Sequence, residues 1–175
     1  MQKKFTKIGI LGGTFDPPHK GHLHISKIAV KKLKLDKLVW IVSKKNPLKK
    51  NPYLSTKIRI KLSKKITRKE KKIFVQYLDH KVKSSNTYSL LSYIKKRNKK
   101  IKIYFLMGAD NLLKFHKWKN WKKIPELAKI VVFSRQNYSA NSLKSVAAKN
   151  LKKKDWVYVS AKKVNISSSL IRKFW

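Results

Sequence analysis

Residues 7–22 read KIGILGGTFDPPHKGH and decide the class of fold. Their first part, residues 7–11, is a short apolar run of the kind that forms a buried strand. Two glycines and a polar stretch follow, and the amphipathic sequence after His22 is typical of a helix. The segment therefore predicts a strand that turns into a helix, which is the building unit of an open α/β sheet.

The turn in this segment carries residues that suit a phosphate. Gly12 and Gly13 allow the backbone to approach a phosphate closely, and the start of the following helix offers unpaired N–H groups and a positive dipole end. His19 and His22 are three residues apart, so both lie on one side of the first turn and face the same anion. A plain turn with two solvent-exposed histidines is the alternative. The combination of two glycines, Asp-Pro and two histidines at one junction favours the phosphate site.

The alternation of strand and helix continues along the chain. Five further apolar runs look like buried strands, at residues 37–42, 73–77, 101–107, 130–133 and 156–159. Apolar residues recur between them at spacings that suit helix faces: Leu23, Ile28, Ala29, Leu33 and Leu35, then Ile58, Ile60, Leu62 and Ile66, then Leu90, Leu91 and Ile94. Strands separated by helices form parallel crossovers. We therefore expect an α/β fold, a Rossmann-like open parallel sheet with helices on both faces, in which ligands bind outside the carboxyl ends of the strands.

Composition bounds the class of protein. A chain of 175 residues, 42% of them hydrophobic, suits one globular domain over residues 1–175. Lys-rich stretches at residues 44–51, 95–102 and 149–154 fall between the expected elements, and we expect them to be solvated loops and helix ends.

The charge of the chain is extreme. Its formal net charge is +39, from 46 basic and seven acidic residues, which is typical of proteins that bind nucleic acid or anionic membranes. Only five of the basic residues are arginine, whereas specific recognition of phosphates and bases tends to use arginine's planar fork. We interpret the excess of lysine mainly as compositional drift that also attracts anionic substrates, and we predict no specific nucleic-acid partner. A selected electrostatic role stays open.

The chain has no cysteine, which excludes a disulfide framework and a thiolate metal site. The apolar run near the N-terminus is too short for a signal sequence, and no segment approaches the roughly 20 apolar residues of a membrane span. We therefore expect a cytoplasmic protein with no membrane partner. The sequence leaves the oligomeric state open.

The segment from Gly12 to His22 resembles the nucleotide-binding signature of the nucleotidyltransferases that carry a His-x-Gly-His motif. It is not a Walker loop, because Gly-x-x-x-x-Gly-Lys-Ser/Thr is absent. The resemblance implies a fold of the nucleotidyltransferase type, in which His19 and His22 contact the triphosphate of ATP and stabilise charge on the α-phosphate and pyrophosphate. The other ATP contacts that it implies here are Gly12, Gly13, Thr14 and Phe15.

A second signature of that family lies near the C-terminus. Residues 166–172 read ISSSLIR and resemble Ile-Ser-Ser-Thr-x-Ile-Arg, with Ser169 where threonine is usual. Serine keeps the hydroxyl, so a helix start capped by serines still suits ATP phosphates, and Arg172 would reach the β- and γ-phosphates as a third catalytic residue. The alternative is a capped terminal helix with a surface arginine. The ATP contacts implied in this signature are Ile166, Ser167, Ser168, Ser169 and Arg172.

The middle of the chain resembles one branch of the superfamily, the nicotinate-nucleotide adenylyltransferases. The stretch at residues 107–113, MGADNLL, carries this resemblance with the tryptophans that follow it, Ser-Arg at 134–135, and residues 40–49. A pyridine ring with a carboxylate needs a flat aromatic partner, which the resemblance assigns to Trp118. It assigns Gly108 and Asp110 to ATP, where Asp110 accepts from a ribose hydroxyl or orients a donor. We expect Trp121 to pack in the core instead.

Three basic or hydroxyl residues complete the implied acceptor site. Arg135 and Lys49 would neutralise phosphate or carboxylate groups, and Thr87 would contact the pyridine nucleotide. The chain departs from the family pattern after two of them: Gln136 and Asn137 replace Pro and Gly, and Ser89 and Leu90 replace an acid and a hydroxyl. The chain also ends at Trp175, where many relatives continue.

The implied reaction transfers the AMP part of ATP to nicotinate mononucleotide, giving deamido-NAD and pyrophosphate in NAD biosynthesis. Mg²⁺ would be held mainly through the ATP phosphates, because the sequence lacks an Asp- and Glu-rich metal site. Two alternatives remain. One is a related transferase with another acceptor, such as nicotinamide mononucleotide, phosphopantetheine or a cytidylyl acceptor. The other is a basic nucleic-acid-binding protein without enzymatic activity.

Overall fold

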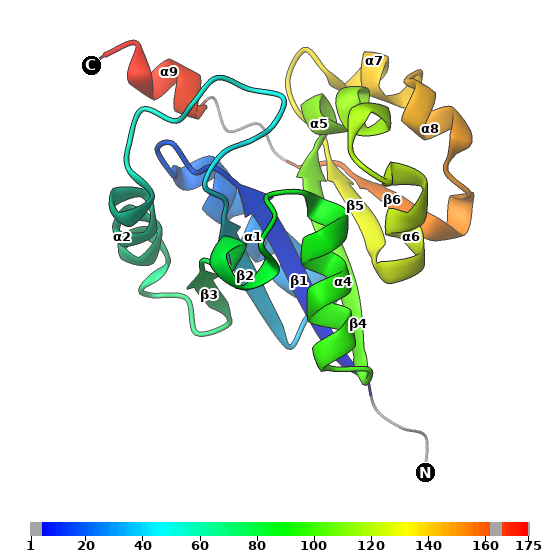
Figure 1. Cartoon of the computed structure of the whole chain (residues 1–175). Helices are drawn as coiled ribbons and strands as arrows, with labels where there is room; N and C mark the ends of the chain where they lie inside the picture. The colour runs from blue at the N-terminus through cyan, green and yellow to red at the C-terminus, as the bar shows by residue number, and fades with distance from the viewer. Residues whose placement is uncertain (1–4, 162–165, 175) are drawn as a thin grey trace.

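The computed structural model describes residues 5–161 and 166–174. Six parallel strands form one sheet in the order β3-β2-β1-β4-β5-β6 (Figure 1). All six strands predicted from the apolar runs are confirmed, with ends that differ by two residues at most. Their bounds are β1 Thr6–Gly13, β2 Lys37–Val42, β3 Ile73–Gln76, β4 Ile101–Gly108, β5 Lys129–Phe133 and β6 Trp156–Val159.

The direction in which strands are added to the sheet reverses between β1 and β4. The chain builds outward from β1 through β2 to β3, and then returns to the other side of β1 with β4, β5 and β6. Leu11 pairs with Leu106 across this junction. In an open parallel sheet the reversal leaves a crevice at the carboxyl ends of the two strands, which is where ligands bind. The segment at residues 12–22 begins there.

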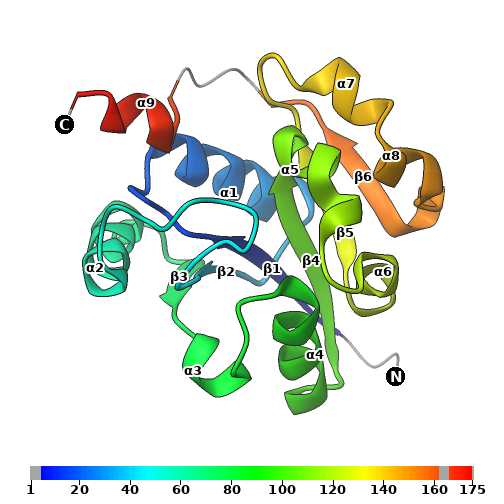
Figure 2. The same ribbon diagram turned by 45° about the horizontal axis from the view of Figure 1, so that its top comes forward.

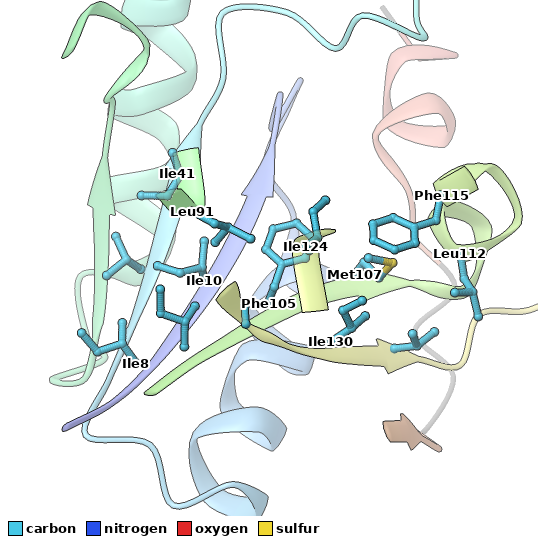
Figure 3. Packing of buried hydrophobic residues seen from close by; sticks show 14 of the residues in the cluster. Ile8, Ile10, Ile41, Leu91, Phe105, Met107, Leu112, Phe115, Ile124 and Ile130 are labelled. Atoms are coloured by element: carbon cyan, nitrogen blue, oxygen red, sulfur yellow. The ribbon is translucent and has the colours of Figure 1, made fainter. Parts of the chain in front are cut away.

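Helices cover one face of the sheet above a core that runs along β1, β4 and β5. These helices are α4 (Thr87–Arg97), α5 (Ala109–Lys114), α6 (Ile124–Leu127) and α8 (Val146–Asn150). Figure 3 shows how Ile10, Phe105 and Met107 of the strands meet Leu91 of α4 and Leu112 of α5. Burying a side chain of this size contributes about 1.5–3 kcal/mol. This packing fixes the ends of β1 and β4 relative to each other.

Two longer helices cover the opposite face. They are α1 (Lys20–Lys32) and α2 (Thr56–Thr67), and they pack over a second core that contains Phe15, Trp40 and Tyr104. With helices on both faces, the predicted Rossmann-like architecture is confirmed.

The remaining elements are short and connect the main ones. They are α3 (Asp79–Val82), α7 (Ser139–Leu143), α9 (Ser168–Arg172) and the 3₁₀ turns η1 (Phe115–Lys117), η2 (Trp121–Lys123) and η3 (Lys153–Asp155). Among the residues described, the helices are all too short or too polar to span a bilayer.

Two details of the predicted helix faces are wrong. Leu35 is fully buried but lies in the turn after α1. Its Cδ1 packs so close to Gly9 that a Cβ at that position would be only 2.7 Å away. In α2 the buried residues are Arg59, Ser63 and Thr67, whereas Ile58 is 46% exposed. Ile60 and Ile66 do pack against the second core, so the prediction for α2 is wrong in part: polar residues, with the Arg59 guanidinium among them, take its most buried positions.

Candidate active site at the carboxyl edge of the sheet

The two histidines of the first signature lie side by side at the start of α1. His19 is the N-cap of the helix and His22 occupies its third position, and the two form a reciprocal capping box. The Nδ1 of His19 accepts the backbone N–H of Gly21 at 3.1 Å, and the Nδ1 of His22 accepts the N–H of His19 at 3.2 Å. The ring centroids are 3.8 Å apart. The helix start therefore holds both rings through their Nδ1 atoms.

These hydrogen bonds determine where each neutral imidazole carries its proton. Because Nδ1 accepts a hydrogen bond in both rings, the proton lies on Nε2, which leaves Nε2–H as the donor. Burial, followed by the positive charge of Arg135, lowers the pKa of His19 to about 4. Burial, followed by the charges of His19, Arg135 and Lys49, lowers the pKa of His22 well below its ordinary value. Both histidines are therefore neutral donors at pH 7.

Two aromatic side chains, Phe15 and Trp40, pack beneath the histidines. The Phe15 ring stacks on Trp40 with centroids 4.8 Å apart and lies 4.9 Å from the His22 ring. The indole N–H of Trp40 donates to Ser26 of α1 at 2.8 Å. Phe15 is 2% exposed, so its side chain belongs to the core and only its backbone is available to the predicted ATP contact.

The glycines of the first signature lie in β1 itself and not in the turn after it. Neither has a positive φ, and the left-handed backbone falls instead on Phe15, with a φ of 51°. A Cβ at Gly12 would lie 3.7 Å from Phe105, an ordinary contact, so the fold does not require glycine there. Gly21 differs, because a Cβ there would lie 2.9 Å from the His19 ring and 3.4 Å from Ile166. The structure is thus compatible with close ligand approach at Gly12, and it needs a glycine at position 21.

Asp110 and Arg135 form an ion pair at the ends of β4 and β5. The Nη1 of Arg135 donates to Oδ2 of Asp110 at 2.7 Å. The other oxygen, Oδ1, is buried and has no hydrogen-bond partner in the described part of the chain. A Cβ at Gly108 would lie 2.5 Å from this oxygen, so the glycine makes room for the carboxylate. Asp110 therefore has an acceptor free for a hydroxyl donor.

The second signature packs directly against the first. Ser167 is the N-cap of α9 and accepts the N–H of Leu170 at 3.1 Å, which confirms the predicted serine cap. Ser168 donates to the carbonyl of Pro17 at 2.8 Å, across 151 residues of sequence. Arg172 donates to the carbonyl of Asp16 and, at 3.3 Å, to the hydroxyl of Ser169. The structure thus places Arg172 at the loop that leads to the histidines.

Two buried charged residues outside the predicted site hold the loop between β2 and α2, residues 44–55. Asp16 accepts the backbone N–H groups of Tyr53 and Leu54 at 2.8 and 2.9 Å. Arg59, which is 1% exposed, uses all five of its N–H groups. They donate to the carbonyls of Thr14, Ser43, Lys44 and Leu54 and to the hydroxyl of Thr56, at distances between 2.6 and 3.0 Å. Figures 1 and 2 both show the cyan 44–55 loop beside α9.

Sequence reasoning missed Asp16 and Arg59 as residues that organise the site. Burial lowers the pKa of Arg59, while Asp16, Asp79 and Tyr77 raise it. A usable signal existed, because an arginine inside a helix rich in lysine points to a task that only a guanidinium can perform.

The residues predicted to bind the pyridine nucleotide come from four separate segments. Trp118 is half-buried and packs edge-on against Phe115 and Phe105, at centroid distances of 5.2 and 6.1 Å. Trp121 packs in the same way on Phe115, at 5.9 Å. Thr87 is the first residue of α4 and Lys49 lies exposed in the 44–55 loop. The core packing expected of Trp121 is therefore shared by Trp118.

Comparison with known proteins agrees with this geometry. A profile of the cytidylyltransferase-like family matches residues 10–174. A probable nicotinate-nucleotide adenylyltransferase of Pelagibacter ubique is 50% identical over 173 residues, which cover 99% of this chain and 96% of the relative. A second one, from Clostridium tetani, is 39% identical over 178 residues, which cover 98% and 86%.

A solved structure shows the same fold. The nicotinic acid mononucleotide adenylyltransferase of Plasmodium falciparum, complexed with NaAD, matches with a TM-score of 0.76 and 22% identity, covering 97% of this chain and 83% of that one. The six-stranded parallel order, the histidine pair at the start of α1 and the two relatives together lead to one assignment. The chain belongs to the cytidylyltransferase-like family and, within it, to the nicotinate-nucleotide adenylyltransferases.

Proposed function

We propose that this chain, acting as a single nucleotidyltransferase domain, transfers the adenylyl group of ATP to nicotinate mononucleotide. The products are deamido-NAD and pyrophosphate, and the reaction is a step of NAD biosynthesis. Its relatives of 50% and 39% identity are probable nicotinate-nucleotide adenylyltransferases. The observation that carries the proposal is the pair of neutral imidazoles whose Nδ1 atoms are held by backbone N–H groups at the carboxyl edge of β1.

The chemistry requires positioning and neutralisation of charge more than proton transfer. A phosphate oxygen of the mononucleotide attacks the α-phosphorus of ATP in line, and the bond from that phosphorus to the pyrophosphate oxygen breaks. The attacking oxygen is already anionic, so no general base is needed. His19 and His22 donate Nε2–H to the oxygens on which charge accumulates, which is the transition-state role of an oxyanion donor. Arg172 binds the β- and γ-phosphates.

The other contacts follow from where the segments meet. Gly12, Gly13, the backbone of Thr14 and Phe15, and Ser167 to Ser169 with Ile166 surround the triphosphate and adenine of ATP. Gly108 and Asp110 receive its ribose, for which Oδ1 of Asp110 is the available acceptor. Trp118 stacks on the pyridine ring, while Thr87, Lys49 and Arg135 bind the phosphate and carboxylate of the acceptor.

Mg²⁺ fits this site as an ion that arrives with ATP. Asp16 is already engaged through both carboxylate oxygens, and in the part of the chain that the structure covers no three His, Asp or Glu side chains gather as a metal cluster. The site instead offers cationic side chains and N–H donors. These groups suit the phosphate oxygens of an ATP molecule that already carries the metal ion. When bound, the ion neutralises phosphate charge.

A cytoplasmic location of the protein also stays a prediction.

The test is a panel of acceptors. Purified protein is incubated with ATP, Mg²⁺ and either nicotinate mononucleotide, nicotinamide mononucleotide or phosphopantetheine, and pyrophosphate release is measured. Release should be fastest with nicotinate mononucleotide, and the nucleotide product should have the mass of deamido-NAD. Faster release with either of the other acceptors would reassign the substrate while the nucleotidyltransferase chemistry stands.

A further inference from the structure

Arg172 has an aromatic neighbour that the proposed mechanism does not use. Its guanidinium carbon lies 4.9 Å from the centroid of the Tyr53 ring, within the range of a cation–π contact. The remaining contacts of the guanidinium are the carbonyl of Asp16, the hydroxyl of Ser169 and, at 3.9 Å, the Asp16 carboxylate. The guanidinium therefore lies over the ring, while its two Nη atoms donate hydrogen bonds to the first signature and to α9.

The side chain of Tyr53 is largely exposed, which is unusual for a ring that holds another side chain in place. The residue is 73% exposed, so the core does not hold its side chain in place. Its backbone, in contrast, is firmly bound. The N–H groups of Tyr53 and Leu54 donate to the two oxygens of buried Asp16, and the Leu54 carbonyl accepts from Nε of Arg59 at 2.9 Å. A fixed backbone thus presents an exposed ring to the guanidinium.

We propose that Tyr53 is a positioning residue that holds the guanidinium of Arg172 in place for the phosphates of ATP. The ring limits the rotamers of a long side chain on the five-residue helix α9. A contact with the ring face uses none of the N–H groups, so those that do not bond Asp16 and Ser169 can bind anions. The proposal rests on the proposed function, because it takes Arg172 to be the residue that binds the phosphates.

The kinetic test uses a conservative and a disruptive variant. Tyr53→Leu should lower kcat/KM for ATP by roughly two- to fivefold, the size of an exposed cation–π contact, and should change KM for nicotinate mononucleotide much less. Tyr53→Phe keeps the ring and should match the wild type. Ile58→Ala, at an exposed position of the helix that follows this loop, is the matched control and should leave both constants unchanged. Wild-type kinetics in Tyr53→Leu, or equal losses in Tyr53→Phe, would overturn the proposal.

A second background separates this proposal from the proposed function. If Tyr53 acts through Arg172, then Tyr53→Leu should have no further effect in an Arg172→Ala protein. Full additivity of the two losses would overturn the positioning role and leave the function intact. If Arg172→Ala by itself keeps wild-type activity, the phosphate role of Arg172 in the proposed function fails, and the positioning proposal fails with it.

A spectroscopic readout checks the contact without turnover. The chain has five arginines, so its ¹⁵N–¹H spectrum has few Nε cross-peaks, and Arg172→Lys identifies the peak of Arg172. The ring current of Tyr53 should displace this peak in the wild type and in Tyr53→Phe. In Tyr53→Leu the peak should move toward the position of an exposed arginine. An unmoved peak would show that the ring does not lie on the guanidinium.

Discussion

The proton on each imidazole determines what the two histidines can do. Both rings accept a backbone N–H at Nδ1, and burial keeps both neutral, so each offers one N–H donor. The spacing of the motif predicted that the rings would face one anion. It did not predict the tautomer, because that depends on the backbone geometry of the N-cap at His19, which spacing alone does not reveal.

Loss of one of these donors should be costly for turnover. We expect His22→Ala to lower kcat by on the order of 10²-fold or more, as the removal of a preorganised transition-state donor does. Steady-state kinetics with saturating ATP and nicotinate mononucleotide measure the effect. His80→Ala, at an exposed position outside the site, is the control. Wild-type turnover in folded His22→Ala would refute the donor role.

The lowered pKa of His19 has a consequence for stability. Below pH 6.5 the unfolded chain takes up a proton at this position, whereas the folded chain does so only near pH 4. The contribution of neutral His19 to the free energy of unfolding should therefore be fully present above pH 6.5. It should fall as the pH drops toward 4, by up to about 1.4 kcal/mol per pH unit. His19→Asn keeps an N-cap acceptor and removes this titration.

Urea unfolding at pH 7 and pH 5 measures the difference. The wild type should lose about 1–2 kcal/mol more stability between these two pH values than His19→Asn does. Equal losses in the two proteins would mean that His19 titrates normally in the folded state.

The two tryptophans differ in their predicted roles but share a packing environment. Trp118→Ala should chiefly raise KM for nicotinate mononucleotide, because the pyridine ring loses its stacking partner. Trp121→Ala should lower the melting temperature and leave that constant near its wild-type value. Initial rates at varied concentrations of each substrate separate the two outcomes. An effect of Trp118→Ala confined to ATP would move Trp118 out of the acceptor site.

At the scale of elements, the strands were the easiest part to predict and α2 the hardest. Strands buried on both faces leave continuous apolar runs in the sequence, and each of the six runs forms a strand. Ile60 and Ile66 of α2 pack against the second core as predicted, whereas Ile58 is exposed. The apolar pattern missed that the most deeply buried positions of the helix are polar, Arg59, Ser63 and Thr67. Arg59 is buried there because its guanidinium donates to carbonyls of the 44–55 loop and of Thr14, and these partners come from distant parts of the chain.

Arg59 should therefore be hard to replace. A lysine has three donors in place of five and no planar fork, so Arg59→Lys should leave buried carbonyls without partners. We expect a loss of roughly 2–4 kcal/mol in the free energy of unfolding, measured with urea. Arg68→Lys, on the exposed end of the same helix, should change it by less than about 0.5 kcal/mol. A stability equal to wild type in Arg59→Lys would refute the role of Arg59 as an anchor.

At the scale of the whole molecule, the net charge of +39 should affect the rate at which substrates reach the site more than the rate of the chemical step. Both substrates are anions, so the field should raise their rate of arrival at the site. We expect kcat/KM for ATP to fall between roughly 0.05 and 0.3 M NaCl while kcat changes little, because salt screens the field before binding. A kcat that falls as steeply as kcat/KM would contradict this.

The same salt series tests the alternative of a nucleic-acid-binding protein. Incidental attraction to RNA should fade steeply by about 0.2 M salt, since it depends on counterion release. Tight binding that survives such salt would favour a dedicated nucleic-acid role for the basic surface.

The 44–55 loop is fastened through its main chain: Asp16 binds two of its N–H groups, and Arg59 binds carbonyls at both of its ends. Because Asp16 and Arg59 bond only backbone atoms of the loop, these contacts do not depend on which side chains lie between them. Apart from Asn46, whose Oδ1 accepts the N–H of Leu48 at 2.9 Å, residues 45–52 should therefore tolerate substitution while these contacts keep both ends of the loop in place. Altered acceptor preference should be easiest to select in this short segment.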